Sequence, residues 1–86
     1  MKIKKEFCIR NICGENTLVP VGETASSFKG IIKVNEIGSS IWNNIEKVVN
    51  EEEIVSMIVK DFNLDFNQAK NDVNDFINYL KDVNII

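Results

Sequence analysis

The chain has 86 residues, of which 44% are hydrophobic and 27% charged, and its formal net charge is −3. This length predicts a single domain, over residues 1–86, with a modest core. The apolar fraction is too high for a disordered chain. No apolar run approaches the ~18–20 residues of a membrane span, and no signal-peptide core follows the basic N-terminal residues. We therefore expect a cytoplasmic protein that does not contact a membrane.

Two residue types are missing or rare, and this excludes several kinds of chemistry. The chain contains no histidine, which excludes Ser-His-Asp and Cys-His catalysis and removes the commonest metal ligand. Arg10 is its single arginine, so no arginine cluster can clamp phosphate groups. The acidic charge balance argues against nucleic acid as a partner. We therefore expect no catalytic residues, no cofactor and no metal. These absences alone leave an enzyme open, but it would have to be an unusual one that works without histidine.

The two cysteines, Cys8 and Cys13, have the spacing C-x4-C. This spacing fits neither a redox CxxC motif nor half of a zinc site. On one extended strand the two side chains would point to opposite faces. We expect both to be buried or half-buried thiols that pack as small hydrophobic groups.

The first third of the chain has the pattern of short strands and turns. The four glycines, Gly14, Gly22, Gly30 and Gly38, recur about every eight residues, which is typical of strands joined by turns. We expect strands at residues 6–12, 17–21 and 28–34, the first two forming a hairpin with its turn at Gly14-Glu15-Asn16. Residues 22–27 are expected to be a polar connection. Pro20 cannot donate to a strand ladder, which places its nitrogen at an edge or a bulge.

Three helices are predicted in the rest of the chain from N-cap residues and apolar periodicity. Asn35 is a suitable N-cap for a helix at about residues 36–47. Asn50 and Asp65 introduce the second and third helices, each with Glu or Gln three residues later. The apolar positions of the third helix repeat at helical spacing and are Ala69, Val73, Phe76, Ile77 and Leu80. We interpret the aromatic and isoleucine positions of the helices mainly as core.

Strands followed by helices predict an α+β fold. We expect a winged-helix-like domain, with a three-stranded antiparallel sheet followed by three helices in the order β-β-β-α-α-α. In a DNA-binding regulator the third helix would be the recognition helix. Its charged residues, two lysines against four aspartates, would repel phosphate. The N-terminal lysines Lys2, Lys4 and Lys5 are interpreted as a solvated fringe.

The third predicted strand is the part of the sheet that points most directly to a function. If it adds to the hairpin, one of its sides is free to pair with another extended chain. Its lysines could act only as gatekeepers against aggregation, or the strand could accept a peptide by β-strand addition. The two interpretations are compatible and both stay open. The candidate residues are Lys29, Gly30, Ile31, Ile32, Lys33 and Val34.

Two segments resemble the coenzyme PQQ synthesis protein D (PqqD) family. Residues 18–22 read Leu-Val-Pro-Val-Gly, and residues 30–42 read Gly-Ile-Ile-Lys-Val-Asn-Glu-Ile-Gly-Ser-Ser-Ile-Trp, which is similar to the family signature at a strand-to-helix junction. Asn35 would cap the helix there, and the small Gly38 and Ser39 would let it pack closely. Val34 and Ile37 depart from the signature, where the family usually has Leu and Thr.

The resemblance implies a non-catalytic peptide chaperone. It would bind the leader of a ribosomally made precursor peptide on the third strand, beside the third helix. It would then present the leader to a maturation enzyme such as a radical SAM protein, a cyclodehydratase, a lanthipeptide synthetase or a leader peptidase. Candidates for the groove wall on the helix are Lys70, Asn71, Val73, Asn74, Ile77 and Asn78. A winged-helix DNA-binding regulator is the alternative, and pairing of the open edge with a second copy leaves a homodimer open.

Overall fold

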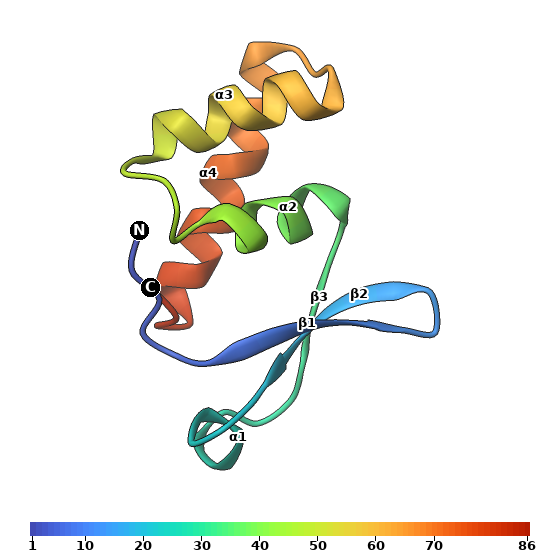
Figure 1. The fold of residues 1–86 in the computed structure, drawn as a ribbon, viewed down its shortest axis with the longest axis vertical. Helices are drawn as coiled ribbons and strands as arrows, with labels where there is room; N and C mark the ends of the chain where they lie inside the picture. Colours follow the sequence, from blue (N-terminus) through green and yellow to red (C-terminus); the bar gives the residue numbers. More distant parts are fainter.

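The computed structural model describes the whole chain, Met1–Ile86. Its elements in chain order are β1 (Phe7–Ile12), β2 (Glu15–Pro20), α1 (Thr24–Ser27), β3 (Ile32–Val34), α2 (Glu36–Asn44), α3 (Glu51–Phe62) and α4 (Phe66–Asp82). In Figure 1 the three longer helices gather at one end of the molecule, and the sheet and α1 lie toward the other. The predicted α+β class, a three-stranded antiparallel sheet followed by helices, is confirmed. The four-residue helix α1 was not predicted and replaces the polar connection.

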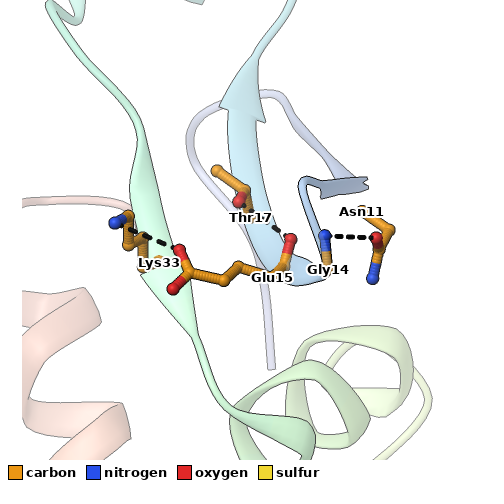
Figure 2. Close-up of polar contacts among 5 residues, drawn as sticks. All are labelled: Asn11, Gly14, Glu15, Thr17 and Lys33. Carbon is orange, nitrogen blue, oxygen red and sulfur yellow. Dashed lines mark hydrogen bonds and ion pairs between the residues drawn. The ribbon is translucent and has the colours of Figure 1, made fainter.

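The hairpin turn is tighter than the sequence suggested. Ile12 of β1 pairs with Glu15 of β2, so the turn consists of Cys13 and Gly14 alone. Both have positive φ, 53° and 83°, as a two-residue type I′ turn requires. The side-chain oxygen of Asn11 accepts a hydrogen bond from the N–H of Gly14 at 3.2 Å (Figure 2). The prediction of a turn at Gly14-Glu15-Asn16 was wrong, because its last two residues already belong to β2.

The position of the turn also separates the two cysteines. Cys8 lies within β1 and is half-buried, as predicted, and Cys13 is exposed at the tip of the hairpin. The expectation that both would pack as small hydrophobic groups was therefore wrong for Cys13, because the chain reverses at that residue.

The third strand is shorter than predicted. It pairs with the central strand β2 over three residues, with Leu18 opposite Ile32 and Asn16 opposite Val34. The predicted start at residue 28 is wrong because Gly30 has a φ of +99°, which interrupts extended backbone. Pro20 lies in the central strand, but β3 has no residue opposite it, so its missing N–H leaves no ladder bond unmade.

All three predicted N-caps are confirmed. The side-chain oxygens of Asn35 and Asn50 accept from backbone N–H groups three residues later, at 2.8 and 3.0 Å. Asp65 accepts from the N–H groups of Asn67 and Gln68, at 3.0 and 3.4 Å. Each cap satisfies donors that a helix start otherwise leaves free. Helix α2 ends at Asn44, three residues before the predicted end.

One hydrophobic core joins the sheet to the helices. The sheet contributes Phe7, Leu18 and Ile32, and every longer helix adds fully buried aliphatic side chains. The ring of Phe7 packs edge-on against Phe28 and Trp42, with centroids 5.0 and 6.2 Å apart. This core fixes α4 beside β3. None of the helices combines the length and the apolar character needed to cross a membrane.

Candidate functional site

The backbone of β3 has one side paired and one side free. The N–H of Val21 donates to the carbonyl oxygen of Glu6 at 3.1 Å. This bond shows which of the opposed residue pairs of the hairpin are hydrogen-bonded. Because bonding directions alternate along a strand, the odd-numbered residues of β2 bond to β1 and the even-numbered ones face β3. Ile32 and Val34 therefore bond to β2, and the N–H and C=O of Lys33 point outward.

The side chain of Lys33 forms an ion pair with the neighbouring strand. Its Nζ is 3.1 Å from Oε2 of Glu15 on the neighbouring strand (Figure 2). Both side chains are more than half exposed, at 71% and 58%, so the pair contributes only about 0–1 kcal/mol to folding. A lysine at an edge discourages uncontrolled strand pairing.

A groove runs along this free edge, between β3 and α4. It has a volume of about 450 Å³, and its lining residues are Ile31, Ile32, Lys33, Val34, Asn35, Phe76 and Tyr79. Two of the lining side chains are large, apolar and well exposed, since Ile31 is 52% and Tyr79 is 42% accessible. The groove therefore has a mostly apolar lining, next to the unpaired backbone N–H and C=O groups of Lys33.

The structure brings four of the twelve candidate residues together. Ile31, Ile32, Lys33 and Val34 line the groove. Lys29 and Gly30 are exposed and do not line the groove. None of the six helix candidates lines it, because the groove face of α4 carries other residues.

The rotation of α4 explains the misplaced helix candidates. Val73 and Ile77 are fully buried, so the expectation that they form the groove wall is wrong. Lys70, Asn71, Asn74 and Asn78 are exposed on other parts of the helix surface. At about 100° per residue, Asn74 lies ~160° around the helix from Phe76.

Two aromatic residues of the groove were missed by the sequence analysis. Phe76 was interpreted as core, but it is only half-buried and contributes to the groove, and Tyr79 was not considered. Both lie beside the apolar stripe of the helix, three residues apart and so on one face. An aromatic pair next to a core stripe was the available signal.

No group of three or more His, Cys, Asp or Glu side chains is placed to hold a metal ion. The N-terminal lysines differ in exposure. Lys5 is half-buried and its Nζ lies 5.5 Å from the ring centroid of Phe28, while Lys2 and Lys4 are exposed.

The sequence comparison agrees with this geometry. Residues 18–86, most of the chain, match the family model described as coenzyme PQQ synthesis protein D (PqqD). The chain belongs to the PqqD family. This family is known for peptide-binding chaperones of PQQ synthesis, which are generally non-catalytic and act with a precursor peptide and a radical SAM enzyme. No curated protein and no solved structure matched the chain significantly.

The PqqD match covers β3 and all three longer helices, and so includes the whole groove between β3 and α4. Strand β1 and the hairpin turn lie before the matched residues. The departures noted in the signature, Val34 and Ile37, fall at the junction of β3 and α2. Val34 lines the groove with its shorter side chain.

Proposed function

We propose that this PqqD-family domain binds the leader segment of a ribosomally made precursor peptide and presents it to a maturation enzyme. The leader adds as a fourth strand to the free edge of β3. The observation that carries this proposal is the outward backbone of Lys33, which lies beside an apolar groove. Strand addition uses such an edge for affinity and the adjacent side-chain pockets for specificity.

The size of the site agrees with a reversible adaptor. A leader strand of about five residues gains a few hydrogen bonds, each worth ~0.5–1.5 kcal/mol, and buries two or three apolar side chains. Ordering a flexible peptide offsets several kcal/mol of this gain. We expect a Kd on the order of 0.1–10 μM. Such an affinity lets the leader be held and then released to the enzyme.

The finer partner assignments follow from this function. The enzyme is a radical SAM protein, a cyclodehydratase, a lanthipeptide synthetase or a leader peptidase, and the open reading frames beside the gene identify which. The alternative, a DNA-binding regulator, has no support from charge. Including its N-cap Asp65, α4 carries four aspartates and two lysines. This is the helix that would enter the groove of DNA, and phosphate binding needs the opposite balance.

The experiment that tests the proposal is a calorimetric titration with the leader of the precursor peptide encoded beside the gene. We expect one-to-one binding in the stated range, which Lys33→Pro weakens. Glu51→Pro is the control, because the first position of a helix tolerates proline. No heat and no NMR shift at millimolar leader would refute the proposal. Salt-dependent binding of duplex DNA by the same protein would favour the regulator.

A further inference from the structure

A second hollow adjoins the groove between β3 and α4, at the start of α2. This hollow has a volume of about 280 Å³, and its lining residues are Asn35, Ile37, Gly38, Ile41, Asp72, Asp75 and Phe76. Asn35 and Phe76 line both cavities. The two cavities therefore adjoin, with Tyr79 in the first and the two aspartates in the second.

The second hollow combines apolar surface with negative charge. Ile41 is fully buried and Phe76 half-buried, while Asp72 is half-buried and Asp75 is exposed. Oδ1 of Asp72 accepts a hydrogen bond from Nε2 of Gln68 at 2.9 Å, and Asp75 has no partner. The one ion pair of the molecule joins Lys33 to Glu15, so no cation neutralises either carboxylate.

The start of α2 does not turn this hollow into an anion site. The N–H of Gly38 is already bonded to the side chain of Asn35 at 2.8 Å. Glu36 occupies the first turn of α2. Asp72 and Asp75 line the hollow beside this helix start. An anion would meet like charges there, and a cation on an aliphatic stem would meet opposite ones.

We propose that the second hollow receives the side chain of a lysine or arginine of the bound peptide. Its methylene groups lie against Ile37 and Phe76, and its cationic head lies between Asp72 and Asp75. This inference rests on the proposed function, because the rest of the peptide is held on β3. It adds a charge requirement to a groove that otherwise selects apolar side chains.

The helix geometry gives the spacing of the two selected residues. The midpoint between Asp72 and Asp75 lies four residues from that between Phe76 and Tyr79, or about 6 Å along the helix. Two residues of an extended strand span about 6.6 Å and point to the same face. An added strand antiparallel to β3, the more stable pairing, runs from Asn35 toward Ile31. The preferred peptide is therefore basic-x-apolar.

A selection from random peptides tests this without knowledge of the natural leader. A displayed library of 12-residue peptides is selected on the folded domain and counter-selected on its Lys33→Pro variant. We expect the recovered peptides to carry lysine or arginine two residues before an apolar residue. One of them is then synthesised with Lys, Gln or Glu at the basic position, and its Kd is measured by fluorescence anisotropy.

Matched variants of the domain decide whether the aspartates are responsible. We expect Gln in the peptide to weaken binding about three- to tenfold, and Glu to weaken it further. Asp72→Asn with Asp75→Asn should abolish this preference. Asp61→Asn with Asp82→Asn changes the net charge equally at exposed positions away from the hollow, and should preserve it.

Two outcomes would overturn the inference, and they are distinguishable. If peptides depend on the β3 edge but show no basic preference, or if the control pair abolishes it equally, the charge requirement is wrong and the proposed function stands. If no recovered peptide depends on that edge, the proposed function fails, and the charge requirement fails with it.

Discussion

Thr17 and Lys33 face each other across β2 and β3 as a pair that exchanges no backbone hydrogen bonds. The backbone groups of Thr17 bond instead to Arg10, its partner in β1. Those of Lys33 have no strand beyond them, since β3 is at the edge of the sheet. A single residue thus offers the central hydrogen bonds of the proposed docking edge.

Proline scanning of β3 tests this edge. Lys33→Pro removes an N–H that bonds to no strand, so we expect the domain to stay folded by circular dichroism. Binding of the leader should weaken at least ~10-fold, or ~1.4 kcal/mol. Ile32→Pro removes a ladder N–H and a buried side chain, so it should destabilise the sheet.

Lys33→Ala separates the backbone effect from the loss of the lysine. It breaks the pair with Glu15 but keeps the N–H, and should change folding stability by less than about 1 kcal/mol. We expect it to bind the leader far better than Lys33→Pro. If Lys33→Pro and Ile32→Pro both fold and bind the leader normally, β3 is not the docking edge.

Tyr79 should contribute to peptide affinity without contributing much to folding. Its side chain is 42% exposed and lines the groove, so Tyr79→Ala removes apolar contact area mainly from the complex. We expect leader binding about three- to tenfold weaker and a free energy of unfolding within about 0.5 kcal/mol of the parent. Asn78→Ala, one residue away and outside the groove, should leave the Kd unchanged, and an equal loss there would contradict this placement.

Gly38 should not tolerate a larger side chain. A Cβ at this position would lie 3.2 Å from Cε1 of Phe76 and 3.3 Å from Cβ of Val34. The Val34 atom is fixed by the strand, so overpacking should exceed the ~1 kcal/mol that alanine gains over glycine in a helix. We expect Gly38→Ala to lower the free energy of unfolding by about 1 kcal/mol in urea denaturation. A more stable variant would show that α2 does not pack this closely.

The rotation of α4 can be checked by its effect on stability. Ile77 is fully buried, and Ile77→Ala should lower the free energy of unfolding by about 2–5 kcal/mol. Asn74→Ala, on the exposed side of the same helix, should change it by less than about 0.5 kcal/mol. Similar effects at the two positions in thermal or chemical denaturation would mean that the helix is rotated differently.

The sequence was informative where the signal is local. Asn35, Asn50 and Asp65 were identified as N-caps because a short polar side chain before an apolar run satisfies free helix donors. The groove depended on tertiary packing, which local patterns do not specify. Phe76 has the spacing of a core residue, and only the angle at which α4 meets β3 turns it toward the groove.

Backbone conformation accounts for the errors in the sheet. A type I′ turn needs two residues with positive φ, and a cysteine is unusual at such a position. The turn was therefore predicted to start at Gly14, one residue after its actual start at Cys13. Gly30 was predicted to lie within the third strand, but its positive φ interrupts the extended backbone. The strand therefore begins only after this residue. The free edge is shorter than expected for this reason.

Amide hydrogen exchange of Lys33 tests the central claim most directly. In the free domain its N–H should exchange faster than those of Ile32 and Val34, which bond to β2. Saturating leader should slow exchange at Lys33 strongly, because its N–H then donates to the added strand. If Lys33 is protected before the leader is added, or stays unprotected when it is bound, the peptide does not pair with β3.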